Sequence, residues 1–377
     1  MHKWLRRIAV IASLAIVALS LGTSAVTNTA KTAIPRSMAL DGAPQSTDGS
    51  TNILLLGLDS RRDNNGKDLP RALLDLMHVG SSSSIGGYNT NTMILIHIPA
   101  GGKKAVAISI PRDDYVQVPG LGGRKIKEAY GLAKYYKTLE LVKQGVSGLE
   151  LERKSREAGR TATIKTVSQL LNVPIDHFAE VNLVGFYHLS IALDGVQVCL
   201  KHAVDDHQYS GAVFPAGLQT LKGVDALKFV RQRHGLPNGD LDRTHRQQAF
   251  ITGVITKFRT QGIFGNLSKL SALLDVAKQD VVIDDGWDVI GFLPNAKALT
   301  GGNITFHTLP IVKYGMINSQ SVNIIDTATV NTYVQNLFYP KVTATPKATS
   351  TAPAKKKVVK VGTNGLPVEG SGIPCVN

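Results

Sequence analysis

A short stretch near the middle of the chain concentrates side chains that could bind an anion. It reads FVRQRHGLPNGDLDRTHRQQ (229–248) and places arginines on both sides of a Gly-Leu-Pro-Asn turn. If 240–260 is a helix, Asp240, Arg243 and Gln247 fall within an arc of about 60°. The same face continues into the apolar residues Phe250, Ile251, Val254 and Phe258. It therefore points toward the core, where an arginine needs a carboxylate or a bound anion as its partner.

The other arginines of this stretch are placed differently. Arg231 and Arg233 lie two residues apart and cannot share a helix face, so we expect them where the preceding helix ends. Arg246 points away from the face of Arg243, and we expect it on the surface. An internal ion pair between Asp240 and Arg243 is the structural alternative, but it leaves three arginines unexplained. The cluster therefore favours a clamp on an anionic ligand.

Two further polar residues follow predicted buried strands. Asp59 comes directly after TNILLLGL (51–58), and Arg112 follows KAVAISI (104–110). Ligands of α/β sheets bind beyond the carboxyl ends of strands, so both side chains are expected to line a pocket. Arginines bind phosphate oxygens with two parallel hydrogen bonds, and carboxylates bind hard cations. These residues predict phosphate-ester or pyrophosphate chemistry with a divalent cation.

Apolar strand patterns alternate with amphipathic helical patterns along the chain. Strands are predicted at 51–58, 92–98, 104–110, 177–184, 196–200 and 303–309. Helices are predicted at about 125–144, 150–172, 185–193, 220–230, 240–260, 266–279, 286–298 and 324–338. This alternation predicts an α/β fold, namely an α/β/α layered domain with a central mixed sheet over residues 51–338.

The N-terminus indicates where the domain resides. A basic flank, MHKWLRR, precedes an uncharged apolar run (8–26), close to the roughly 20 residues that a membrane-spanning helix needs. Residues 1–27 therefore predict a cytoplasmic flank and a single transmembrane anchor, followed by a spacer (28–50) and an extracytoplasmic domain. A signal peptide cleaved near the small residues 23–25 is the alternative, and it would give a secreted protein. Either location argues against nucleic acid as the partner, although the net charge is +14.

The two cysteines and the C-terminal segment fit an exported protein. Cys199 and Cys375 are too far apart in sequence for a zinc or thiol redox motif. A disulfide between them would tie the C-terminus to the domain, and two separate thiols are the alternative. Residues 339–377 are rich in Pro, Thr, Ala and Lys, which predicts a flexible tail.

Several motifs together resemble the LytR-CpsA-Psr family of cell-envelope proteins. In order from Asn52 to Lys257 they are NILLLGLDSR, AVAISIPRDDYV, KIKEAYGLA, TVSQLLNVPIDHFAEVNLVGFYHL and LKFVRQRHGLPNGDLDRTHRQQ. The resemblance implies a membrane-anchored transferase with a long apolar pocket for a prenyl chain. Its substrate would be a glycopolymer on a polyprenyl-pyrophosphate carrier. The product would be a phosphodiester to the muramic acid 6-hydroxyl of peptidoglycan.

The resemblance also implies roles for residues at matching positions. The residues expected to hold the pyrophosphate are Arg112, Lys125, Arg231, Arg233, Arg243 and Gln247. Asp240 would be a further pocket acid, acting in catalysis with the arginines and Gln247. Asp59 and Asn91 would bind Mg²⁺ or Mn²⁺, and either Asp59 or Asp240 would take the proton of the acceptor hydroxyl.

One departure from the family pattern concerns the metal. Members usually carry Arg-x-Asp-Thr before the second strand, whereas this chain reads YNTNTMIL, with Asn89 and Asn91. An asparagine carbonyl can ligate a hard cation but supplies no negative charge, so metal affinity should fall. Asp68 and Asp75, in an insertion after Asp59, are candidates to replace that charge. A non-catalytic binder of lipid-linked or wall glycopolymer and a polyprenyl-pyrophosphate hydrolase therefore stay open as alternative functions.

Overall fold

The computed structural model describes residues 34–80, 87–102, 104–260, 267–289, 291–292, 304–340, 368–369 and 372–377. The predicted flank and membrane anchor lie outside these residues. Among the helices that are described, none combines the length and the apolar character needed to cross a membrane.

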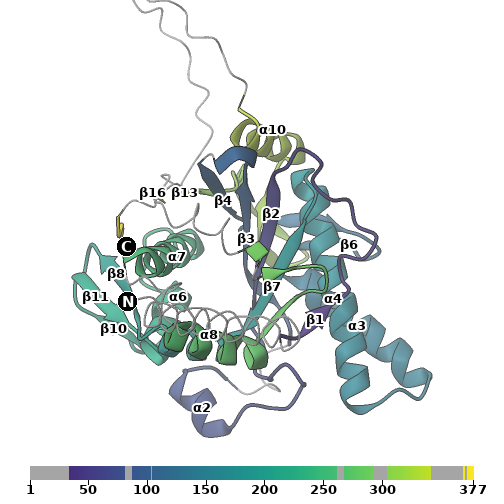
Figure 1. The fold of residues 1–377 in the computed structure, drawn as a ribbon, viewed down its shortest axis with the longest axis horizontal. Helices are drawn as coiled ribbons and strands as arrows, with labels where there is room; N and C mark the ends of the chain where they lie inside the picture. The colour runs from purple at the N-terminus through teal and green to yellow at the C-terminus, as the bar shows by residue number, and fades with distance from the viewer. Residues whose placement is uncertain are drawn as a thin grey trace, which may run out of the picture.

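A mixed sheet forms the middle layer of the domain (Figure 1). Its order is β1 (Arg36–Ser37), β12 (Val281–Asp284), β7 (His177–Asn182), β2 (Thr51–Leu58), β3 (Thr90–Ile98), β4 (Ala105–Ser109), β13 (Ile304–Thr308) and β16 (Val368–Glu369). The central strand β2 runs parallel to β7 and antiparallel to β3. The predicted mixed sheet is therefore confirmed.

Both faces of the sheet are apolar, because its central strands are covered on both sides. Leu54 and Leu56 of β2 belong to one hydrophobic core, whereas Ile53 belongs to the other. Successive side chains of a strand point to opposite faces, so a strand buried on both sides reads as a continuous apolar run. This explains why β2 was predictable to the residue.

Helices cover the two faces. On one side lie α3 (Glu128–Lys143), α4 (Gly148–Leu171) and α10 (Thr327–Phe338), and on the other lie α5 (Leu183–Ala192), α7 (Asp240–Thr260) and α8 (Leu267–Asp280). Figure 1 shows α3, α4 and α10 on the opposite side of the sheet from α7 and α8. The α/β/α layering is thus as predicted. The helix α6 (Val224–Arg231) precedes α7.

A small second sheet packs on the outer side of α7. It consists of β11 (Gly217–Leu221), β8 (Val196–Leu200) and β17 (Cys375–Val376). A Cβ atom at Gly253 of α7 would lie 2.3 Å from the carbonyl oxygen of Gln197, so the helix can approach β8 closely only with glycine there. The predicted disulfide between Cys199 and Cys375 is present and joins β8 to β17.

The C-terminus corrects the prediction for Arg246. This side chain is fully buried rather than exposed, because the last residues of the chain cover this part of α7. Its Nε donates a hydrogen bond to the backbone oxygen of Asn377 at 2.6 Å, and its guanidinium lies 5.0 Å from the ring centroid of Phe229. Helical periodicity could not predict this, because the residues that bury Arg246 lie at the C-terminus, far from α7 in sequence.

Two predicted boundaries also change. The segment predicted as a spacer contributes β1, and its Ile34 and Leu40 are buried, so the domain begins before residue 51. The tail contributes β16 and β17, so its described parts belong to the domain. Of the helix predicted at 286–298, only 286–289 and 291–292 are described.

Short elements escaped prediction. They include α2 (Arg71–Leu76), η1 (Ala100–Gly102), β11 and β12, with the hairpins of β5 (Tyr115–Val118) and β6 (Gly122–Lys125), β9 (Val204–Asp206) and β10 (Ala212–Phe214), and β14 (Lys313–Ile317) and β15 (Gln320–Ile324). The predicted strand at 177–184 ends at Asn182, whose side chain accepts a hydrogen bond from Gly185 N at 2.8 Å and so begins α5.

Candidate functional site

A pocket of about 720 Å³ lies between the central sheet and helices α5, α6, α7 and α8. One part of its lining is polar and consists of Asp59, Arg61, Asn89, Asn91, Arg112, Lys127, Arg231, Arg233, Arg243 and Gln247. The other part includes the apolar residues Leu55, Ile94, Val181, Leu183, Phe186, Leu189, Leu193, Leu227, Val230, Phe250, Ile251, Val254, Phe258 and Leu273. The pocket can therefore hold a ligand with a strongly anionic group and a long apolar group.

The helix α7 contributes to both parts of the pocket. Arg243 and Gln247 lie on its first turns and line the polar part, and Phe250, Val254 and Phe258 follow along the same face in the apolar part. This confirms the predicted direction of the Arg243 face.

Arg243 is buried and shares its carboxylate partner. Its Nη2 lies 3.0 Å from Oδ2 of Asp240, and the other oxygen of Asp240 lies 3.1 Å from Nε of Arg112. The ion pair considered from the sequence is therefore present, but one carboxylate faces two guanidinium groups. Burial lowers the pKa of Arg243 to about 10, although Asp240 opposes this change. The ligand-free site is short of negative charge.

Arg231 and Arg233 lie where α6 ends, as predicted. Arg231 is the last residue of the helix, and its Nη1 donates to the backbone oxygen of Met77 at 3.0 Å. Burial lowers the pKa of Arg231. Arg233 is exposed at the edge of the pocket. The structure thus brings both arginines to the same pocket as Arg112 and Arg243.

Of the two lysines in KIK, Lys127 lines the pocket and Lys125 does not. The Nζ atom of Lys127 lies 2.6 Å from Oδ1 of Asp113, whereas Nζ of Lys125 is 3.6 Å from the same atom. Although burial opposes ionisation of Asp113, the hydrogen bond from Lys127 and the charge of Arg112 lower its pKa. Lys125 was expected in the site only because it matches a motif position of the family, and the structure places the next lysine of KIK in the lining instead.

Asp59 belongs to a chain of hydrogen bonds along the polar part. Its Oδ1 accepts from Nη1 of Arg61 at 2.8 Å, and its Oδ2 accepts from Nδ2 of Asn91 at 2.8 Å. Oδ1 of Asn91 in turn accepts from Nη1 of Arg112 at 3.0 Å. Arg61 was missed from the sequence, where two adjacent arginines follow Ser60 and nothing local distinguishes them.

The comparison with known proteins assigns the family. Residues 16–338 match the sequence profile of the LytR_cpsA_psr family. The chain belongs to the LytR_cpsA_psr family.

Three relatives of this LytR_cpsA_psr protein illustrate the similarity. It is 43% identical over 295 residues to the cell wall biosynthesis protein LcpA of Corynebacterium glutamicum, covering 76% of this chain and 55% of LcpA. It is 30% identical over 266 residues to the polyisoprenyl-teichoic acid–peptidoglycan teichoic acid transferase TagU of Oceanobacillus iheyensis, covering 71% and 68% of the two chains. A structure of TagT bound to LI-WTA shares the fold, with a TM-score of 0.53, 21% identity, and coverage of 80% and 95%. The chain thus spans little more than half the length of LcpA.

The pocket of this LytR_cpsA_psr protein does not form the expected site for Mg²⁺ or Mn²⁺. Asp59 is the one acidic residue of the pocket lining among the described residues, and both of its oxygens already accept hydrogen bonds. The carbonyl of Asn91 faces Arg112 rather than Asp59. In the described part of the chain, no group of three or more His, Cys, Asp or Glu residues could hold a metal ion. Asp68 and Asp75 pair with Arg62 and Arg71, at 2.8 and 2.9 Å, outside the lining.

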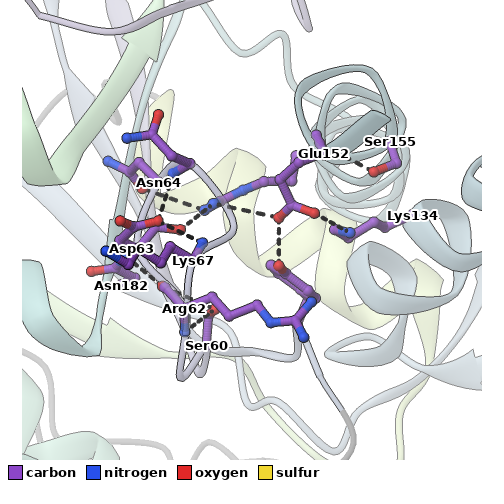
Figure 2. A network of polar contacts seen from close by, with 12 residues as sticks. Ser60, Arg62, Asp63, Asn64, Lys67, Lys134, Glu152, Ser155 and Asn182 are labelled. Atoms are coloured by element: carbon purple, nitrogen blue, oxygen red, sulfur yellow. Dashed lines mark hydrogen bonds and ion pairs between the residues drawn. The ribbon is translucent and has the colours of Figure 1, made fainter. Parts of the chain in front are cut away.

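A partly buried polar network holds the loop that follows Asp59, including Ser60, Arg62 and Asp63 (Figure 2). Nη1 of Arg156 in α4 donates to the backbone oxygen of Asp63 at 3.0 Å, and Asn182 Nδ2 donates to Arg62 O at 3.2 Å. Glu152 of the same helix accepts from Lys134 at 2.8 Å and from the hydroxyl of Tyr88.

The same network reaches the segment before β3. Tyr88 lies one residue before Asn89, whose backbone oxygen accepts from the Asp59 amide at 2.8 Å. Both segments that carry the polar chain are therefore tied to α4, and the position of Arg61 and Asn91 is defined by the fold.

Proposed function

We propose that this protein transfers a glycopolymer from a polyprenyl-pyrophosphate carrier to the muramic acid 6-hydroxyl of peptidoglycan. The observation that carries the proposal is one pocket whose polar part includes Arg112, Arg231 and Arg243 and whose other part is lined by apolar side chains. The family supports it, as does the name of TagU, which describes a transferase of polyisoprenyl-linked teichoic acid to peptidoglycan.

The polar end suits a pyrophosphate because it carries uncompensated positive charge. Arg112 and Arg243 share Asp240, and the hydrogen bonds of Arg231 to described residues go to the backbone oxygens of Met77 and His78 rather than to a carboxylate. A buried cation without its own counter-ion is stabilised when an anion binds. Arginine presents donors that match phosphate oxygens in pairs.

The apolar end suits a prenyl chain. Side chains from α5, α7 and α8, among them Leu189, Val254 and Leu273, line it, and apolar side chains of this kind suit a hydrocarbon chain. No charged residue of the described lining lies along α7 beyond Arg243. A sugar phosphate without a lipid would leave this part of the pocket without a partner.

The reaction is a phosphoryl transfer in this arrangement. The hydroxyl oxygen of the acceptor sugar forms a bond to the phosphorus next to the glycopolymer. The bond from that phosphorus to the bridging oxygen breaks, and polyprenyl monophosphate leaves with the bond electrons. Arg112, Arg231 and Arg243 stabilise the charge on the phosphoryl oxygens, which is where such reactions gain most. The hydroxyl proton goes to a carboxylate, either that of Asp59, which lines the pocket, or that of Asp240, which lies between Arg112 and Arg243.

We further propose that the domain acts outside the cytoplasm on a membrane anchor formed by residues 1–27. The apolar run of 8–26 after a basic flank supports this location. The disulfide between Cys199 and Cys375 also supports it, because disulfides persist in oxidising compartments.

The test uses the full-length chain in detergent with a polyprenyl-pyrophosphate glycan and a peptidoglycan oligomer. Mass spectrometry would follow polyprenyl phosphate and the joined glycan–peptidoglycan product. A phosphodiester product that requires the oligomer is expected. Polyprenyl phosphate released without the joined product would show a hydrolase, and retained carrier without release would show a binder.

Two variants test the division of the pocket. Arg231→Ala should abolish transfer for every carrier, because the pyrophosphate loses a direct contact. Val254→Trp should weaken binding of a long-chain carrier by about tenfold or more, while a two-isoprene pyrophosphate binds as before. Val213→Trp is the matched control, since Val213 is an exposed residue of β10 outside the pocket. Equal loss for both chain lengths would contradict the assignment of the apolar end.

A further inference from the structure

We propose that the guanidinium of Arg61 takes the place of a divalent cation in this site, so that the protein needs no metal. This inference rests on the proposed function, because it concerns how the same pocket neutralises a pyrophosphate. It explains why the residues of the polar part do not form the metal site that was expected from the sequence.

The first argument is the occupancy of Asp59. A hard cation competes with any cation or donor already bound to the carboxylate, and it prefers a second anionic ligand nearby. Oδ1 of Asp59 is held by Arg61 at 2.8 Å, and Oδ2 is held by Asn91 at 2.8 Å. Arg61 is almost fully buried and lines the pocket. Its positive charge therefore neutralises the carboxylate of Asp59, as a bound metal ion would.

The second argument is the chemistry of Asn91. An amide can donate from Nδ2 and accept at Oδ1 at the same time, and Asn91 does both, toward Asp59 and Arg112. An aspartate at this position would face Asp59 as a like charge, which is the arrangement that a bound cation stabilises. With asparagine the contact is satisfied without a cation.

The third argument is the surrounding charge. Arg61, Arg112 and Lys127 all line the polar part, and none of them can be moved far, because each is paired with Asp59, Asn91 or Asp113. A divalent cation on Asp59 would have to share this carboxylate with Arg61 and would lie among other cations. The pyrophosphate brings the missing negative charge, and the arginines are already positioned to receive it.

The experiment measures metal binding and turnover separately on the full-length protein in detergent. Electron paramagnetic resonance would follow free Mn²⁺ with the wild type, with Arg61→Ala, and with the double variant Arg61→Ala, Asn91→Asp. The wild type should leave the free Mn²⁺ signal unchanged, and the double variant should reduce it. Chelator should change the release of polyprenyl phosphate by the wild type less than about twofold.

A matched control removes an arginine from another Arg–Asp pair. Arg71→Ala breaks the exposed pair with Asp75 and should behave as the wild type does in both measurements. Circular dichroism of each variant would show that it is folded, and the wild-type measurements need no variant at all.

The outcomes separate this inference from the proposed function. Binding of Mn²⁺ by the wild type, or loss of release with chelator, would overturn the role of Arg61 and leave the transferase standing. A wild type that neither binds nor cleaves polyprenyl pyrophosphate, with or without metal, would overturn both.

Discussion

Replacing Arg243 with Met should make the ligand-free protein more stable. Burial lowers the pKa of Arg243 to about 10, and its side chain is only 7% exposed. One pKa unit corresponds to about 1.4 kcal/mol, so keeping this group protonated in the fold costs about 3 kcal/mol. This pKa already includes the attraction of Asp240, which keeps Arg112 as a partner, so the further loss is the hydrogen bond from Arg243 to the backbone oxygen of Asn91, at about 1 kcal/mol. The free energy of unfolding should therefore rise by about 2 kcal/mol at pH 7.

The direction of the pKa change of Arg243 determines how the stability difference between variant and wild type depends on pH. The pKa of Arg243 is lower in the fold than in the unfolded chain, so the folded state binds fewer protons at high pH. The cost is fully present below about pH 10 and disappears as the pH rises further. Variant and wild type should thus differ by a constant amount across the range in which most assays are run.

Urea unfolding followed by circular dichroism would measure the difference, with the midpoint compared at equal slope. In the presence of polyprenyl pyrophosphate the order should reverse. A ligand at 100 times its Kd stabilises a protein by about 2.7 kcal/mol, and the variant should lose this gain. A variant that is more stable than the wild type without ligand and less stable with ligand would show that Arg243 serves binding rather than folding.

Arg160 provides the matched control, because its side chain is as buried as that of Arg243, both being 7% exposed. It lies 2.9 and 3.0 Å from the two oxygens of Glu180. Arg160→Met leaves that buried carboxylate short of a partner and should destabilise the protein by about 3–5 kcal/mol. If Arg243→Met destabilises to a similar extent, Arg243 and Asp240 form a structural ion pair and the reasoning from excess charge is refuted.

Three further predictions concern the framework of the site. Although burial opposes ionisation of Glu180, Arg160 and Arg156 outweigh it and lower its pKa to about 2, so stability should fall as the pH drops from about 4.5 toward 2. The urea concentration at the midpoint of unfolding, measured across this pH range, would show the loss of stability. Cys375→Ser should lower the free energy of unfolding by about 5 kcal/mol, because the lost disulfide closes a long loop. The substitution should lower the Tm as much as reduction of the wild type does. Gly253→Ala should cost about 1–3 kcal/mol by clashing with β8, whereas an unchanged Tm would disprove that contact.

The long elements were predictable because their patterns are local. The range of α7 agrees with its prediction to the residue, since one face repeats with a period of 3.6 over 21 residues. β2 and β8 were also predicted to the residue, because both are short apolar runs between turn residues. In these elements each residue's neighbours in sequence already decide its environment.

The missed strands depend on partners far away in the chain. In β1, Arg36 pairs with Ile283, and in β17, Cys375 pairs with Cys199. Two-residue strands have no periodicity of their own, so only the edge that they join defines them. For the same reason the domain boundaries at both ends were drawn too far inward, and Arg246 was placed on the surface.

Single side chains of the site also divide into those whose direction local sequence decides and those whose direction distant contacts decide. Residues on one helix face, such as Arg243 and Gln247, were assigned to the pocket from the sequence because helix geometry sets their direction. Arg61 was not, because Arg62 beside it pairs with Asp68 on the surface while Arg61 turns inward to Asp59. That difference is set by the path of the loop.

The path of that loop is itself determined by buried charges. Arg156 of α4 holds the backbone at Asp63, and its guanidinium is paired with Glu180 of β7 at 2.9 Å. Breaking a pair of this kind leaves an uncompensated charge in the core, so its geometry is strongly fixed. Sequence reasoning can therefore name the charged residues of such a site. Which of two adjacent arginines lines the pocket follows only when the contacts that hold the loop are known.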